Sequence, residues 1–204
     1  ELQEAQENLN DKLKYLPTCR SNAFSPTFNM VTGIFNIDPK FPDYYDMGIR
    51  TTKFQIEHAT VESTGIVNVN EDLVICGNKT LEIKPGGVVN TIIGNILVKP
   101  TSIIDVKGDL RIGANTKIQF GSTAKIVLRA GSRLIIEDNA QLLVDFSGVL
   151  QFYDGAEIIM EGNDSEITLK GGITVMDGGT FQINHINGIS GRFIVDSPWA
   201  GINA

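Results

Sequence analysis

The sequence predicts an all-β fold, a parallel β-helix or solenoid of short strands, from three regularities. Pairs of apolar residues separated by one residue recur along the chain, as in strands that point two side chains to one face. From Ile118 to Ile158 the first members of these pairs stand at 118, 126, 134, 142, 150 and 158, a period of eight. Glycine or asparagine, which favour turns, separates the pairs. A coil that repeats the coil beneath it keeps such a period, whereas a meander of hairpins does not.

Two segments precede the repeats. Residues 1–17 are expected to form an N-terminal helix, because four leucines occupy heptad-like positions before a closing proline. This helix either docks on the rest of the chain or ends a coiled coil. Residues 18–55 have no clean period but many prolines and aromatics, so we expect an irregular cap or linker whose aromatics form a small core. The repeat region is expected to span residues 56–204.

The chemistry of the outward residues indicates how many octads make one coil. Grouping the octads by two, for a coil of about 16 residues, places Val127, Leu143 and Ile159 in one apolar stripe. Grouping by three, for a coil of about 24 residues, mixes apolar and polar side chains. The segregation favours the two-octad coil, with the three-octad coil as the alternative. An apolar stripe is either a surface for a partner or is covered by residues 1–52 or by a second layer.

Composition excludes several functional classes. The chain has 204 residues with ordinary apolar and charged fractions, enough for one medium domain or two small ones. Its net charge is −7 and its pI is near 4.8, with no basic cluster. We therefore expect no nucleic-acid partner. Apolar runs are too short for membrane insertion. No motif for a metal or a cofactor occurs, and we expect neither.

A two-octad coil would stack charged residues into two ladders. Stacked carboxylates serve glycoside hydrolysis or hold a cation, so a polysaccharide-cleaving hydrolase or lyase is the minority hypothesis. Each ladder also contains a cation, which favours ion-pair rows at the coil corners and a protein that is not an enzyme. The candidate acids of the minority hypothesis, expected to face a common groove, are Asp138, Asp154, Asp145 and Glu161.

The two cysteines, Cys19 and Cys76, lack the spacing of a metal site. They are either two buried thiols or one disulfide that ties the N-terminal segment to the first repeats. The chain opens without methionine or an apolar leader, which indicates a removed signal peptide or an internal fragment. Residues 192–202 read as the start of another coil. We expect that the natural chain continues or that rods associate end to end.

The runs Asp72–Gly87, Ala124–Asp138 and Trp199–Ile202 resemble repeats in large secreted surface proteins of Bacteroidetes-type bacteria. The resemblance covers about residues 70 to 204 and rests on a repeat of low specificity. It implies right-handed parallel β-helices and a secreted, cell-surface location. It implies no activity, because the matching runs contain no catalytic residues.

Octad strands after a heptad helix also resemble the trimeric fibres and spikes of phage tails, although the inward residues here are large. Together these features predict a non-catalytic structural or adhesive scaffold, a component of cell-surface attachment or of a filament. Its expected partners are other protein chains or surface glycans, with end-to-end or trimeric self-association as further expectations. A trimeric phage fibre stem and a polysaccharide-cleaving enzyme are the alternative functions.

Overall fold

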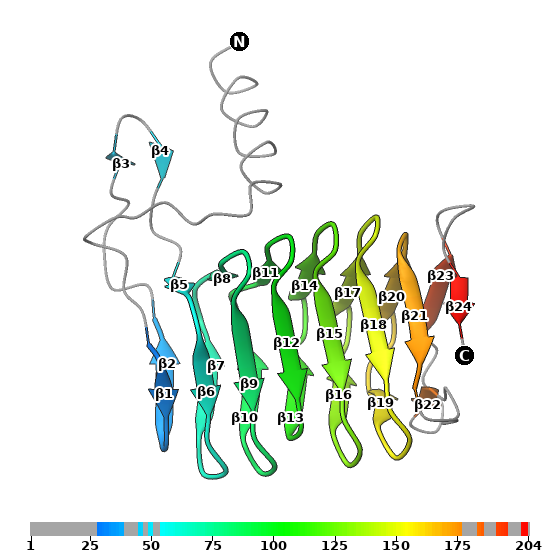
Figure 1. The fold of residues 1–204 in the computed structure, drawn as a ribbon, viewed down its shortest axis with the longest axis horizontal. Helices are drawn as coiled ribbons and strands as arrows, with labels where there is room; N and C mark the ends of the chain where they lie inside the picture. Colours follow the sequence, from blue (N-terminus) through cyan, green and yellow to red (C-terminus); the bar gives the residue numbers. More distant parts are fainter. Residues whose placement is uncertain are drawn as a thin grey trace.

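We describe the protein from a computed structural model, which describes residues 28–38, 45–46, 49–50, 54–176, 183–185, 191–195 and 201–203. Most of these residues form one coil wound into a rod with three faces (Figure 1). In Figure 1 the chain runs downward through the near sheet and returns upward behind it while advancing to the right, so the coil is right-handed. The predicted all-β parallel solenoid is therefore confirmed.

Three parallel sheets make the faces, and each coil passes from sheet A to sheet B to sheet D. Sheet A contains β1 (Met30–Val31), β6 (Ala59–Val61), β9 (Thr80–Ile83), β12 (Ile103–Val106), β15 (Lys125–Leu128), β18 (Val149–Phe152), β21 (Gly172–Val175) and β24 (Gly201–Asn203). Sheet B contains β2 (Ile34–Ile37), β7 (Ile66–Val69), β10 (Val88–Thr91), β13 (Asp109–Ile112), β16 (Arg133–Ile136), β19 (Glu157–Met160) and β22 (Ile183–His185). Sheet D contains β5 (Phe54–Ile56), β8 (Leu73–Ile75), β11 (Ile96–Val98), β14 (Lys117–Phe120), β17 (Gln141–Val144), β20 (Glu166–Leu169) and β23 (Arg192–Val195). The short strands β3 (Tyr45–Asp46) and β4 (Ile49–Arg50) form an antiparallel pair, sheet C.

One coil contains three octads, and the predicted two-octad coil is wrong. Lys125 of β15 pairs with Val149 of β18, so the residue number rises by 149 − 125 = 24 from one coil to the next. Arg133 pairs with Glu157 at the same separation. The prediction failed because it required outward residues of one chemistry to stack. In the register observed, apolar and polar residues share one outer column, as Asp105, Val127 and Gln151 do on sheet A.

The regular octads share one local design, which explains the period of eight. Four strand residues point out, in, out and in, and a four-residue corner follows. The third corner residue has positive φ, as at Asn139 (52°) and Gly155 (77°). The N–H of the last corner residue donates to the carbonyl of the first, as from Ala140 to Glu137 at 3.1 Å. Positive φ at the third position alone, closed by this hydrogen bond, is the pattern of a type II turn.

The last corner residue points into the rod and is small. Ala124, Ser132 and Ala140 occupy this position and are fully buried. At Gly108 the corner is shorter, and a Cβ atom would lie 2.2 Å from the carbonyl oxygen of Gly87 in the coil beneath. Corner backbones of successive coils therefore approach too closely at this point for any residue but glycine.

The core is a continuous column of inward side chains from all three sheets. The largest of these are Phe120 and Phe152, each at most 1% exposed. Near the first coils, Phe28, Phe35 and Phe54 form an aromatic cluster with ring centroids 5.1 to 5.8 Å apart. This cluster agrees with a small aromatic core in the segment expected to be irregular.

The solenoid starts earlier than the sequence predicted. Strands β1 and β2 pair in parallel with β6 and β7, so the first two strands of the solenoid lie inside residues 18–55. The expected helix over residues 1–17 lies outside the described residues. In the part of the chain that the structure describes, no helix is long and apolar enough to cross a membrane.

Candidate functional site

The predicted apolar stripe does not exist as a stripe. Val127 lies on sheet A, Leu143 on sheet D and Ile159 on sheet B, so the three side chains occupy three different faces. Val127 is only 3% exposed, because its neighbours in the outward column of sheet A are Asp105 and Gln151. Val127 therefore offers almost no apolar surface to a partner.

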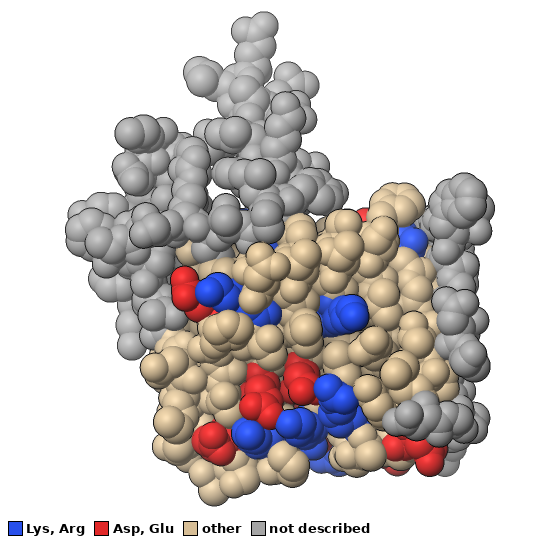
Figure 2. Space-filling model, viewed as in Figure 1, with Lys and Arg blue, Asp and Glu red and all other residues tan. Residues whose placement is uncertain are grey.

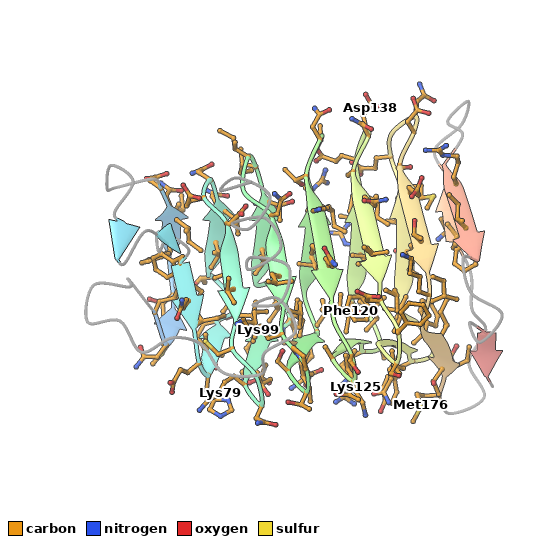
Figure 3. The ribbon with its side chains drawn as sticks, turned by 90° about the horizontal axis from the view of Figure 1, so that it is seen from above. Lys79, Lys99, Phe120, Lys125, Asp138 and Met176 are labelled. Atoms are coloured by element: carbon orange, nitrogen blue, oxygen red, sulfur yellow. The ribbon has the colours of Figure 1, made fainter. Side chains whose placement is uncertain are left out.

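The four candidate acids also lie at different corners of the rod. Asp154 lies at the corner between sheets A and B, and Asp145 at the corner between sheets D and A. Asp138 and Glu161 lie at the corner between sheets B and D, in successive coils. In Figure 3 Asp138 projects from the rod on the side opposite Lys79 and Lys125.

The two predicted ladders are therefore wrong, and the four acids face no common groove. They were derived from a two-octad spacing, which joins residues that lie on different faces of a three-octad coil. The carboxylate of Asp145 accepts the backbone N–H of Phe146 at 2.8 Å, and Glu161 contacts Arg111. These acids serve a turn and an ion pair.

The true register instead places a charged array on sheet A. Glu82 and Asp105 are register partners in neighbouring strands, so both stand in one outward column. The residue that follows the last residue of each strand is a cation: Lys84 after β9, Lys107 after β12 and Arg129 after β15. The backbone N–H of each cation donates to a carbonyl of the coil beneath, so the ladder of hydrogen bonds continues through this position. Figure 2 shows this face, with acidic and basic side chains side by side in its lower part. Like charges of the cation column, about 4.8 Å apart by strand spacing, are offset by the acidic column beside them.

Ion pairing across coils holds this array together. Lys107 Nζ lies 2.5 Å from Glu82 Oε1, and Lys84 Nζ lies 3.3 Å from the same oxygen. The hydrogen bond from Lys107 lowers the pKa of Glu82, against the smaller opposing effect of burial. The same bond raises the pKa of Lys107. These side chains are 25% to 37% exposed, so each pair contributes less than about 1 kcal/mol of stability.

Arg129 ends the cation column and links three coils. Its Nε donates to Asp105 Oδ1 at 2.8 Å, and its guanidinium carbon lies 4.7 Å above the ring centroid of Tyr153 in the next coil. The bond to Asp105 raises the pKa of Arg129. A guanidinium so placed makes a cation–π contact with the ring, which fixes both side chains on the face.

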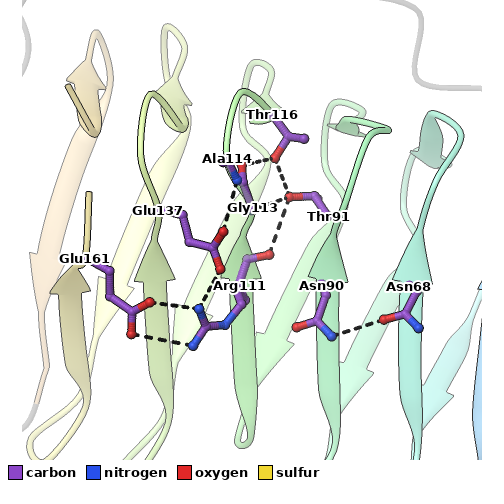
Figure 4. Close-up of polar contacts among 9 residues, drawn as sticks. All are labelled: Asn68, Asn90, Thr91, Arg111, Gly113, Ala114, Thr116, Glu137 and Glu161. Atoms are coloured by element: carbon purple, nitrogen blue, oxygen red, sulfur yellow. Dashed lines mark hydrogen bonds and ion pairs between the residues drawn. The ribbon is translucent and has the colours of Figure 1, made fainter. Parts of the chain in front are cut away.

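A second ionic network lies on sheet B. Arg111 Nη1 lies 2.5 Å from Glu137 Oε1 and 2.8 Å from Glu161 Oε2, so one guanidinium joins three coils (Figure 4). Burial lowers the pKa of Arg111, but the two carboxylates outweigh it and the net pKa is raised. In the adjacent outward column Arg133 forms a two-point pair with Asp109.

Beneath this network, Thr91 takes an inward position that is apolar in the neighbouring coils. Its hydroxyl lies 2.5 Å from the hydroxyl of Thr116 and accepts the backbone N–H of Gly113 at 2.8 Å (Figure 4). Thr116 in turn donates to the Gly113 carbonyl at 2.6 Å. Both threonines are buried, so their bonds satisfy polar groups that water does not reach.

Sequence reasoning missed these ion pairs because it compared positions two octads apart. Arg129 with Asp105 and Arg133 with Asp109 are each three octads apart, and an acid–base comparison at that interval would have found both.

Cys76 is disulfide-bonded. Cys19, the partner expected from the sequence, lies outside the described residues, so the pairing remains a prediction. Among the described residues, no group of three or more His, Cys, Asp or Glu side chains is placed to hold a metal ion.

Comparison of the chain with protein-family models, with curated proteins and with solved structures finds no match. The geometry of the three faces is therefore the basis for a functional assignment.

Proposed function

We propose that the protein is a non-catalytic scaffold and adhesive module, secreted and held at the cell surface. The observation that carries the proposal is the ladder of parallel strands in three sheets, continuous from β1 to β24 in sheet A. Each interior strand pairs with a strand above and a strand below, so extension of the rod breaks rows of hydrogen bonds together. Such a rod presents its outer residues at fixed intervals.

The disulfide at Cys76 supports the secreted location, because disulfides persist in oxidising compartments and are rare in the cytosol. The parallel register supports the adhesive role, because it presents the outward side chains of successive coils to a partner in rows along each face. The partners proposed are other protein chains or surface glycans. One chain builds all three faces of the rod, which supports a single-chain scaffold over a stem that needs three chains.

Antibody labelling of intact producing cells, compared with permeabilised cells, tests the location. Labelling of intact cells is expected, and labelling only after permeabilisation would refute the proposal. Retention of the purified chain by the producing cells or by other cells tests adhesion.

Light scattering and product analysis test the alternatives. A solution mass of one chain, with or without reductant, is expected, and a threefold mass would favour the trimeric fibre stem. Incubation with polysaccharides should release neither new reducing ends nor unsaturated products. Their release would favour the enzyme.

A further inference from the structure

The first three coils of sheet B carry an outer surface of unusual regularity. Strands β2, β7 and β10 each present an aliphatic residue and, two positions later, an asparagine to the outside. Their register places like residues directly beside one another. We call this surface the uncharged grid, and it consists of Ile34, Ile66, Val88, Asn36, Asn68 and Asn90.

The amides of the grid form one oriented ladder. The Nδ2 of Asn68 donates to Oδ1 of Asn36 at 2.9 Å. The Nδ2 of Asn90 donates to Oδ1 of Asn68 at 3.1 Å, as Figure 4 shows. Each amide group offers two donors and two acceptor lone pairs. The ladder uses one donor and one acceptor lone pair of Asn68, and the amide has one further donor and one further lone pair.

The grid differs from the rest of its face in charge. In the next coil the same two columns become Asp109 and Arg111, and the ionic network begins there. At the edge of the grid, the carboxylate of Asp38 accepts a hydrogen bond from Asn70 at 2.7 Å. A surface that lacks charge offers no ion pair to a polyanion or a polycation, and the net charge of −7 further disfavours polyanions.

Apolar surface accompanies the amides. Ile34 is 72% exposed, and Ile92 and Ile93, at the corner that follows β10, are 48% and 75% exposed. Aliphatic columns beside amide columns suit a ligand that has both apolar faces and hydroxyl groups, as sugars do. Neighbouring coils of the grid lie about 4.8 Å apart along the rod, and the two outward residues of one strand lie about 6.6 Å apart. A linear polymer that follows the rod therefore meets the same pair of groups in each coil.

From this geometry we infer that the uncharged grid binds a neutral polysaccharide chain. The inference rests on the proposed adhesive function and names its ligand class. Each sugar contributes a weak contact, and the repetition of the grid along one chain and of the chain along a surface makes the sum effective.

Depletion of the full chain from solution by insoluble chitin and by cellulose tests the inference, with cross-linked, insoluble polygalacturonate as the charged comparator. Wild-type protein is expected to bind at least one neutral polymer. Asn68→Asp adds charge with little change of shape and should lower that affinity tenfold or more. Ile34→Lys alters an exposed side chain without cost to the core and should act likewise. Glu157→Gln, on the ionic half of sheet B, should change it less than twofold.

Thermal unfolding of each variant distinguishes lost binding from lost structure, and Ile34→Lys decides the matter if Asn68→Asp unfolds. Three results would each overturn the inference. Neither neutral polymer retains the protein, Ile34→Lys binds with wild-type affinity, or polygalacturonate binds the protein as well as the neutral polymers do. A wild-type dimer that Ile34→Lys dissociates would overturn it also, since a second copy would then occupy the grid. If cells retain the protein while both polymers fail, only this inference is lost, whereas failure to bind cells refutes the adhesive function.

Discussion

The three-octad coil makes a sharp prediction about cross-links. Gln119 and Leu143 are register partners in sheet D, and their positions differ by 143 − 119 = 24. Adjacent strands place their Cα atoms about 4.8 Å apart, inside the usual disulfide range of about 4.4–6.8 Å. The double variant Gln119→Cys/Leu143→Cys should therefore oxidise without backbone movement. The matched pair Val127→Cys/Leu143→Cys, two octads apart on two different faces, should not.

The cross-link should also stabilise the rod. It closes a loop of about 25 residues, from 119 to 143, for which the chain-entropy relation gives about 3.5 kcal/mol at 25 °C. Peptide mapping by mass spectrometry identifies which cysteines are joined, including the native ones, and urea unfolding with and without reductant gives the energy. Oxidation of the two-octad pair, or none of the three-octad pair in folded protein, would refute the register.

Three further predictions concern a corner, a buried hydroxyl and an ion pair. Gly108→Ala drives a Cβ atom into the backbone beneath and should cost about 1–3 kcal/mol in urea unfolding. Gly33→Ala, with open space around its Cβ position, should change stability by less than about 0.5 kcal/mol, and equal effects would contradict the corner model. Thr91→Val removes the acceptor of a buried backbone N–H and should cost about 1–3 kcal/mol, so an unchanged midpoint would show that the network contributes nothing. The Glu82 pKa is lowered, so its stabilisation is present above the ordinary carboxyl value and is lost as pH falls through the folded value. The raised pKa of Lys107 makes its contribution present below its ordinary value of 10.5 and lost as pH rises through the folded value. The stability difference between wild type and Lys107→Met, under about 1 kcal/mol, should thus be constant at neutral pH and vanish in acid, and a difference that persists in acid would exclude the pair as its cause.

Much of the fold is written locally in the sequence. Alternation of apolar and other residues fixes which side chains of a strand point inward, and pairs such as Leu142/Val144 are buried as expected. The turn residues between the pairs fix the corners, because Asn139 and Gly131 adopt the positive φ that those residues favour. Strand, corner and period could therefore be predicted without any knowledge of distant contacts.

The candidate sites could be predicted much less well. The choice of acids and of the apolar stripe depended on the register, and an error of one octad moved every residue to another face. Val127 illustrates the cost, because a residue that alone reads as exposed and apolar is covered by the polar side chains of Asp105 and Gln151 in the coils on either side.

Local chemistry by itself determined that the chain coils in octads around an apolar interior, because strand alternation and turn preference act over a few residues. Only the tertiary structure decided that three octads close one coil, since the regular corners share one kind of turn and none of them marks where a coil is complete. Closure depends on how the inward side chains of three sheets fill the interior together. That packing also decides which residues of successive coils meet on the surface to form the ion pairs of Arg129 and the amide ladder of Asn68.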